Sequence, residues 1–277
     1  MNETLRTTGD RSVLRMERRL AHRPEKVWRA LTQPAQLAQW FPSSVRLELR
    51  VGGEIAFDFP PDTPGVITEL DPPRVIAYTW DRDLLHWEVR PDGEGTLLVL
   101  THTINDHYGA PSFAAGWTTC IAAMDTLLAG GATPPSGEAG NPDELMEGFV
   151  TALGLDQGVT DDLGVRFERQ LTRPIPAVWA ALGGDPGEGR VPDGFTVREF
   201  PPTGLGEVKA PHLLEYVTRS GRVRWELRDG TGQGARLVLT HACPPEERAT
   251  ALSAWREHIG RLAQRLLSTP KDSGKPA

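Results

Sequence analysis

The segment PEKVWRALTQP at residues 24–34 decides the fold of this chain, because a second version of its core appears later in the same sequence. VWRAL at 27–31 returns as VWAAL at 178–182, and ERRL at 17–20 returns as ERQL at 168–171. The separation is the same for both pairs, since 178 lies 151 positions after 27 and 168 lies 151 positions after 17. Matches in one order at one separation indicate a tandem duplication.

Further matches follow in the same order, but at a separation of 138 or 139 positions. They pair PRVIAY at 73–78 with PHLLEY at 211–216, WEVR at 87–90 with WELR at 225–228, LVLTH at 98–102 with LVLTH at 237–241, and Trp117 with Trp255. The second copy is therefore about 13 residues shorter after Leu182. We expect it to lack about one short strand and its turn, in the region that corresponds to residues 36–59 of the first copy.

The duplication divides the 277 residues into two domains, in line with a usual size of about 100–200 residues per domain. We expect a first domain over residues 12–130, a linker with a short helix over 131–163, and a second, degenerate domain over 164–269. The linker is expected because residues 130–140 are rich in Gly, Pro and Ser. The short helix is expected because Asn141 and Pro142 form a helix start.

Composition and charge exclude several classes of protein. The chain is 24% charged and 39% hydrophobic, as globular proteins are, and its net charge of −7 leaves no chain-wide basic surface for nucleic acid. No run approaches 18 apolar residues, so no membrane span is expected, and the polar residues 1–11 contain no signal-peptide core. The two cysteines, Cys120 and Cys243, predict neither a disulfide framework nor a CxxC metal site. We expect a cytoplasmic protein without metal or other cofactor, either a monomer or a homodimer.

The order of patterns within the first copy predicts an α+β fold. Alternation predicts a strand over 13–20, proline-started apolar stripes predict helices over 24–31 and 34–40, and a longer stripe predicts a helix over 112–128. Strand patterns separated by turn signals lie between them, at 45–49, 54–59, 65–70, 74–80, 84–90 and 96–103. An antiparallel sheet curved around the long C-terminal helix is the packing that buries both apolar faces.

Comparison of the two copies predicts which face of a strand is buried. Leu97 aligns with the charged Arg236, so the side that carries Leu97 and Val99 is expected to face outward and the side with His102 inward. The same alternation in the other strands predicts an aromatic interior with a single histidine. The predicted ligand-binding residues are Trp40, Phe57, Phe59, Tyr78, Trp80, Trp87, His102 and Trp117. Aromatic walls with few polar groups are typical of ligand pockets.

Several short motifs of the first copy are shared with a known family. They are the segment at 24–34, LAQWF at 37–41, VGGE at 51–54, LTH at 100–102 and GW at 116–117. On these motifs, about residues 13–130 resemble the Hsp90-ATPase-activator-homologue-like group of the START-type (SRPBCC) ligand-binding superfamily. The second copy, about 164–268, keeps the counterparts of the helical tryptophan and of the LTH and GW motifs, but departs where LAQWF and VGGE should be.

The resemblance implies two tandem helix-grip domains, each with a cavity between the sheet and the long helix. The ligand of such a cavity is typically a small apolar or amphipathic molecule. We therefore predict that the first domain binds a small hydrophobic molecule and that the second is a degenerate structural partner.

Two other functions stay open. A polyketide aromatase/cyclase-like enzyme would need a polar acid or base in the pocket, for which His102 with Tyr78 are the candidates. The same histidine can instead be structural, bonded to backbone at a strand end. An Hsp90-type co-chaperone or stress-response protein would need an additional N-terminal domain, and none fits before Val13. The GxSxG, HExxH and P-loop signatures are absent, so no catalytic residue is assigned.

Overall fold

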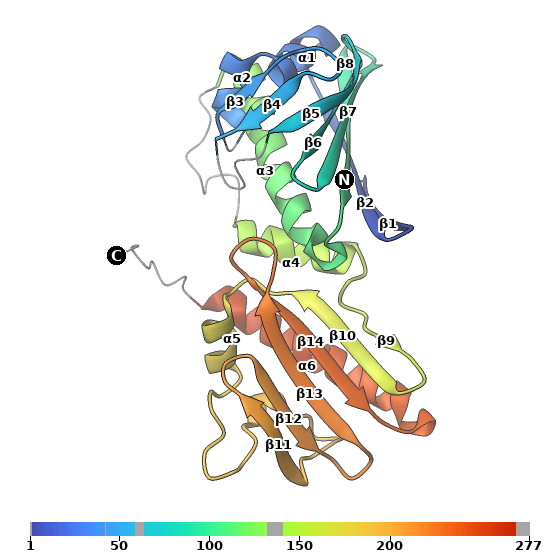
Figure 1. Ribbon diagram of the computed structural model, residues 1–277, viewed down its shortest axis with the longest axis vertical. Helices are drawn as coiled ribbons and strands as arrows, with labels where there is room; N and C mark the ends of the chain where they lie inside the picture. The colour runs from blue at the N-terminus through green and yellow to red at the C-terminus, as the bar shows by residue number, and fades with distance from the viewer. Residues whose placement is uncertain (1, 42, 59–63, 132–140, 270–277) are drawn as a thin grey trace, which may run out of the picture. The chain divides into compact units, whose positions relative to one another are not determined.

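The computed structural model describes residues 2–41, 43–58, 64–131 and 141–269 of the chain. The chain forms two compact units, Met1–Pro142 and Asp143–Ala277 (Figure 1). Each unit contains one antiparallel sheet and one long helix that follows the sheet's last strand. The predicted fold class, two α+β helix-grip domains, is confirmed. No helix among the described residues is long and apolar enough to cross a membrane.

The first unit is built on a sheet with the strand order β1-β2-β8-β7-β6-β5-β4-β3, in which neighbouring strands are antiparallel. The strands are β1 (Asn2–Thr8), β2 (Arg11–Leu20), β3 (Val45–Leu47), β4 (Glu54–Phe57), β5 (Gly65–Asp71), β6 (Val75–Trp80), β7 (Asp83–Asp92) and β8 (Gly95–Ile104). The α-helices are α1 (Pro24–Thr32), α2 (Pro34–Trp40) and α3 (Ala110–Leu128).

The two short helices begin and end where the prolines dictate. Pro24 opens α1 and Pro34 opens α2, since proline at the first helical position gives up an N–H that would have no partner there. Gln33 lies between them in an extended conformation, as the residue before a proline prefers. Both predicted helices are confirmed, and α1 buries Val27 and Trp28 against the sheet.

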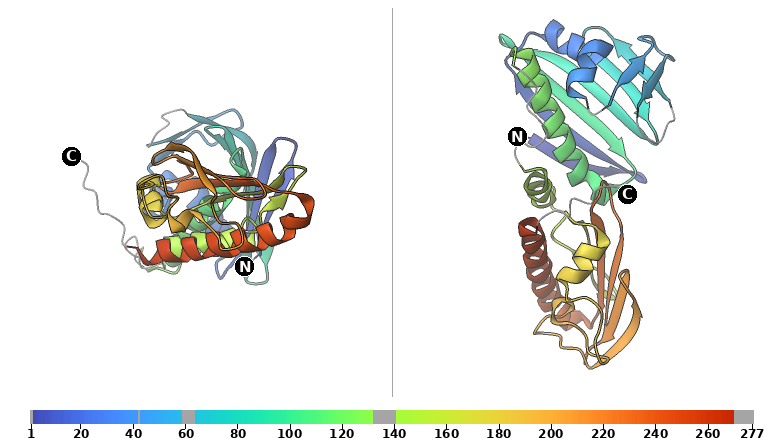
Figure 2. Two further views of the ribbon diagram at one scale, coloured as in Figure 1. Left: turned by 90° about the horizontal axis from the view of Figure 1, so that it is seen from below. Right: turned by 90° about the vertical axis from the view of Figure 1, so that its left-hand side faces the viewer.

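The long helix α3 lies along one face of the sheet (Figure 2). Its 19 residues extend about 28 Å at about 1.5 Å per residue, enough to cross the sheet. Trp117, Ile121, Met124 and Leu128 recur at helical spacing and are all buried. The predicted helix is confirmed and begins two residues earlier than expected.

Strand β8 alternates as predicted, with one exception in burial. His102 is 1% exposed on the inner side, as expected. Val99, on the opposite side, was expected to face solvent but is 0% exposed. It stands in register between Glu17 of β2 and Glu88 of β7, so larger side chains flank it on both neighbouring strands. Alternation therefore assigned the face of Val99 correctly and its exposure wrongly.

The second unit has the strand order β11-β12-β13-β14-β10-β9. Its strands are β9 (Val159–Thr160), β10 (Gly164–Gln170), β11 (Gly204–Lys209), β12 (Leu213–Val217), β13 (Arg222–Asp229) and β14 (Ala235–Ala242). Its α-helices are α4 (Pro142–Ala152), α5 (Ile175–Ala181) and α6 (Arg248–Ser268).

The second unit lacks more than the expected strand and turn. Between α5 and β11 the described chain forms only the 3₁₀ turn Asp193–Phe195, whereas the first unit has α2, β3 and β4 between α1 and β5. The prediction of one lost strand was wrong. The change in separation between the two copies shows how many residues the second copy lacks. It does not show that the residues that remain there form irregular structure instead of strands.

The expected start of each domain leaves out an element. Strand β1 pairs with β2 along its length, although the first domain was expected to begin at residue 12. Its sequence NETLRTT lacks the apolar alternation of a half-buried strand because it lies at the sheet edge. Helix α4, expected in the linker, falls with the second unit, where Glu147 pairs with the buried Arg169 and Asp143 with Arg173.

Candidate functional site

The predicted ligand-binding residues that the structure describes come together on the inner side of the first sheet. All of them except His102, together with the neighbouring Phe41, form what we call the aromatic cluster: Trp40, Phe41, Phe57, Tyr78, Trp80, Trp87 and Trp117. These rings come from α2 and the residue after it, β4, β6, β7 and α3. Phe59 lies outside the described residues.

Phe41 is central to the cluster, and the sequence-based site missed it. Its ring centroid lies 5.6 Å from that of Trp40, 5.7 Å from Phe57, 5.8 Å from Trp80 and 5.9 Å from Trp117. Phe41 belongs to no strand, so the alternation that identified the other rings could not find it. The available signal was its place in LAQWF, directly after the buried Trp40.

Trp80 forms the edge of the cluster. Its ring stacks on Phe57 with centroids 5.1 Å apart and planes 25° apart, and it meets Trp117 edge-on at 5.8 Å. Trp80 is half-buried, whereas Trp87 is 1% exposed. The cluster therefore reaches solvent at Trp80.

Three of the four indole N–H groups of the cluster donate to partners within the protein, those of Trp40, Trp87 and Trp117. Trp40 donates its indole N–H to the Ala30 carbonyl at 3.0 Å, and Trp87 donates to the Tyr78 hydroxyl at 3.2 Å. Burial raises the pKa of Tyr78 well above its ordinary value, so this hydroxyl stays protonated near neutral pH. The cluster therefore offers a ligand mainly apolar ring faces.

His102 joins the cluster to the sheet through both of its ring nitrogens. Trp117 donates its indole N–H to Nδ1 at 3.2 Å, and an indole nitrogen can only donate. The imidazole is therefore neutral with its proton on Nε2, which donates to Asp83 Oδ2 at 3.1 Å. The expected bond from His102 to backbone was wrong, because two side chains take that role. With both nitrogens engaged, His102 is not available as a general base.

In the second unit, a different segment fills the space between the sheet and the long helix. Tyr216 and Trp225, the counterparts of Tyr78 and Trp87, each donate to the Phe195 carbonyl at 3.0 Å. Phe195 is 0% exposed, and its ring meets that of Trp225 edge-on. The irregular chain after α5 thus occupies the interior that the first unit lines with aromatic rings.

The tryptophan–histidine pair is repeated in the second unit, but the aspartate that bonds to the histidine in the first unit has no counterpart. Trp255 donates to His241 Nδ1 at 3.1 Å, whereas His241 Nε2 is buried without a hydrogen-bond partner among the described residues. Gly221 stands at the position of Asp83, and a Cβ there would lie 1.8 Å from the Ala242 carbonyl oxygen. Burial lowers the pKa of His241 from 6.5 to about 4, which keeps the ring neutral.

The described residues contain no group of three or more His, Cys, Asp or Glu side chains that could hold a metal ion. The arrangement of the first unit, with its curved sheet, long helix and apolar ring faces, defines the class of helix-grip domains.

Residues 21–129 match the family model described as Activator of Hsp90 ATPase homolog 1-like protein. The match covers less than half of the chain and lies within the first unit. The comparison with curated proteins found no match.

Several solved structures are similar to part of the chain. A conserved protein of unknown function from Enterococcus faecalis, EF2215, shares 21% identity over 54% of this chain and 89% of its own, with a TM-score of 0.48. CalU16 from Micromonospora echinospora shares 22% identity over 54% and 94%, with a TM-score of 0.46. Protein NE0264 from Nitrosomonas europaea shares 24% identity over 45% and 97%, with a TM-score of 0.39.

Proposed function

We propose that the first unit binds a small hydrophobic molecule at the aromatic cluster. The observation that carries this proposal is the gathering of large rings from five elements, with Trp80 half-buried at the edge. The second unit does not offer the same arrangement, because Thr218 stands at the position of Trp80 and Phe195 occupies its interior. One ligand-binding site in the first unit is the arrangement that these differences support.

A ligand would enter beside Trp80 and take the place of its contact with Phe57. Separation of one aromatic pair costs about 1 kcal/mol. Coverage of about 200 Å² of apolar ligand surface contributes about 5 kcal/mol at about 25 cal/mol per Å². A planar molecule of two or three fused rings therefore compensates for opening the cluster. The indole N–H groups of Trp40 and Trp87 are already bonded, so selectivity would come from shape and apolar contact.

An aromatase/cyclase activity has less support from the site. His102, the residue expected to act as acid or base, uses both ring nitrogens for Trp117 and Asp83. Tyr78 is buried and its hydroxyl accepts from Trp87. His102 cannot act on a reacting molecule without breaking one of these bonds, and burial raises the pKa of Tyr78, which makes its hydroxyl a weak acid.

A cytoplasmic location belongs to the same proposal. Cys120 is half-buried and Cys243 is buried, and both are free thiols in different units. Free thiols persist in reducing compartments.

The proposal is tested by thermal unfolding of the full chain with a planar aromatic probe, 8-anilinonaphthalene-1-sulfonate, and with a library of fused-ring molecules. We expect a saturable rise in the melting temperature, and at least a tenfold weaker affinity in Trp80→Ala. Leu163→Ala is the control, because Leu163 is 78% exposed in the second unit and its loss should leave affinity unchanged. If no apolar molecule shifts the transition, or if both variants bind equally, the aromatic cluster is only a packed core.

A further inference from the structure

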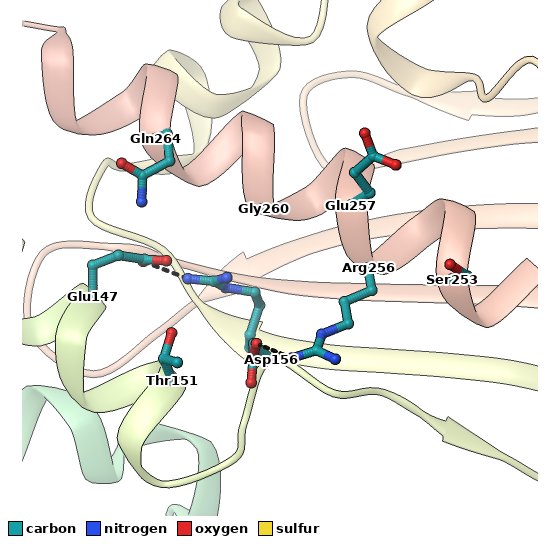
Figure 3. A pocket seen from close by; sticks show the side chains of 9 residues that line it. Glu147, Thr151, Asp156, Ser253, Arg256, Glu257, Gly260 and Gln264 are labelled. Atoms are coloured by element: carbon teal, nitrogen blue, oxygen red, sulfur yellow. Dashed lines mark hydrogen bonds and ion pairs between the residues drawn. The ribbon is translucent and has the colours of Figure 1, made fainter.

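The second unit has a polar cleft on the side of α6 that carries Gly260, separate from the aromatic cluster of the first unit. The cleft has a volume of ≈ 430 Å³ and is lined by α4, the turn that follows it, β10 and α6 (Figure 3). No aromatic or aliphatic side chain lines it. The cleft therefore does not suit a hydrophobic ligand.

The cleft exists because the two units cover the same strand differently. In the first unit, Glu3 of the long edge strand β1 pairs with Arg18 at 2.5 Å, and Arg18 also donates to Thr118 of α3. In the second unit the edge strand β9 has two residues, and Glu147 of α4 pairs instead with Arg169, the counterpart of Arg18. A helix in place of a strand leaves the space beside α6 open.

Gly260 is an independent sign that this space is kept open. It lies in the middle of the 21-residue helix α6, where glycine costs helix stability relative to alanine. A Cβ at this position would meet nothing within 4 Å, so no packing contact requires glycine. The first unit has Ala122 at the corresponding position. Figure 3 shows Gly260 on the wall of the cleft between Gln264 and Glu257.

Four of the five charged side chains that line the cleft form two pairs with further bonding capacity, and the fifth, Glu257, pairs with Arg261. Arg169 is 3% exposed and uses Nη2 for Glu147 and Nε for the Gln170 carbonyl. Its Nη1 and the Glu147 Oε1 form no hydrogen bond within the described residues. Across the cleft, Arg256 Nη2 donates to Asp156 Oδ2 at 2.9 Å. Each side therefore presents a guanidinium donor next to a carboxylate.

We infer that this cleft binds a small zwitterion, of the class of free amino acids and short peptides. A simple anion would meet the carboxylates of Glu147 and Asp156, and a simple cation would meet Arg169 and Arg256. A molecule with a carboxylate at one end and an ammonium group at the other pairs with a guanidinium and a carboxylate at once. The hydroxyl of Thr151, also on the wall, offers a further polar contact.

The test is calorimetric titration of the full chain with the common amino acids and with glycylglycine. Two analogues of glycine, N-acetylglycine and glycinamide, each lack one of the charges and serve as matched ligands. We expect at least one zwitterion to bind, and to bind at least tenfold more tightly than its singly charged analogues. If no zwitterion binds, or if the analogues bind equally well, the inference is wrong.

A matched pair of variants locates the binding. Gly260→Gln places a side chain in the cleft and should weaken zwitterion binding at least tenfold. Gly116→Gln is the control, because Gly116 lies in α3 of the first unit, also with nothing within 4 Å of its Cβ position. Both variants should fold, and both should keep the affinity for the aromatic probe. Zwitterion binding that survives Gly260→Gln would place it elsewhere and overturn the inference.

Discussion

Trp117 of α3 donates its indole N–H to His102 Nδ1 of β8 at 3.2 Å, and so ties the long helix to the sheet. The pair returns in the second unit as Trp255 and His241 at 3.1 Å. Its presence in both units, including the one in which Thr218 stands at the position of Trp80, indicates a role in holding the helix to the sheet.

Replacement of His102 should cost more stability than replacement of His241. His102→Phe leaves the Trp117 N–H and Asp83 without their partner, at a cost of about 1–3 kcal/mol. His241→Phe leaves one N–H unpaired but removes a nitrogen that is already unsatisfied, so its cost should be smaller. Urea unfolding of both variants measures the difference. Equal losses would show that the Asp83 contact does not contribute.

Stability of the second unit should fall as the pH is lowered from about 6.5 to about 4. Burial lowers the pKa of His241 from 6.5 to about 4, so the unfolded chain binds a proton more readily than the folded one. The stabilisation is complete above pH 6.5 and is lost as the pH falls toward 4. His258, whose pKa is also lowered by burial, acts in the same direction.

Denaturant unfolding at a series of pH values measures this dependence, and His241→Phe should reduce its slope. A variant with the same slope as the natural chain would show that His241 is not the group that titrates.

The two tryptophans of neighbouring strands should differ in their contribution to stability. Trp87 is 1% exposed, so Trp87→Ala should destabilise the first unit by about 3–5 kcal/mol. Trp80 is half-buried, and Trp80→Ala should cost less because part of its surface is already in water. Guanidinium unfolding of the two variants compares them. A larger loss for Trp80 would argue that it belongs to the closed core and not to its edge.

The ion pair between Glu147 and Arg169 should be critical for the packing of α4. Glu147→Gln leaves a guanidinium that is 97% removed from solvent without its counter-charge, which costs about 3–5 kcal/mol. Arg261→Gln, which breaks an exposed pair with Glu257, is the comparison and should cost less than about 1 kcal/mol. Hydrogen exchange of the α4 amides reports the effect directly. Similar protection in both variants would contradict the importance of this pair.

Much of the fold could be predicted from the sequence because the duplication provides two versions of each pattern. Prolines marked the starts of α1 and α2, and helical spacing marked α3. Strand β1 could not be predicted, because one of its inward positions is the charged Glu3, which is buried by its pairing with Arg18 and breaks the apolar alternation.

The candidate site was predictable where it lies on strands and the long helix, and not beyond them. Tyr78, Trp80 and Trp87 follow period-two alternation, whereas Phe41 lies after a helix and obeys no period. The hydrogen bond between Asp83 and His102 could not be predicted either, because it depends on the pairing of β7 with β8, which brings together residues distant in sequence. The cleft beside Gly260 arises from α4 in place of a strand, a substitution that no local pattern records.

The indole ¹⁵N–¹H resonances provide the most direct test of ligand binding in the first unit, because the tryptophans are divided between the two units. Titration with an apolar aromatic ligand should shift the signals of Trp40, Trp80, Trp87 and Trp117 in a saturable manner. The signals of Trp179, Trp225 and Trp255 in the second unit should stay in place. Shifts confined to the second unit, or no saturable shift at all, would contradict a ligand site at the aromatic cluster.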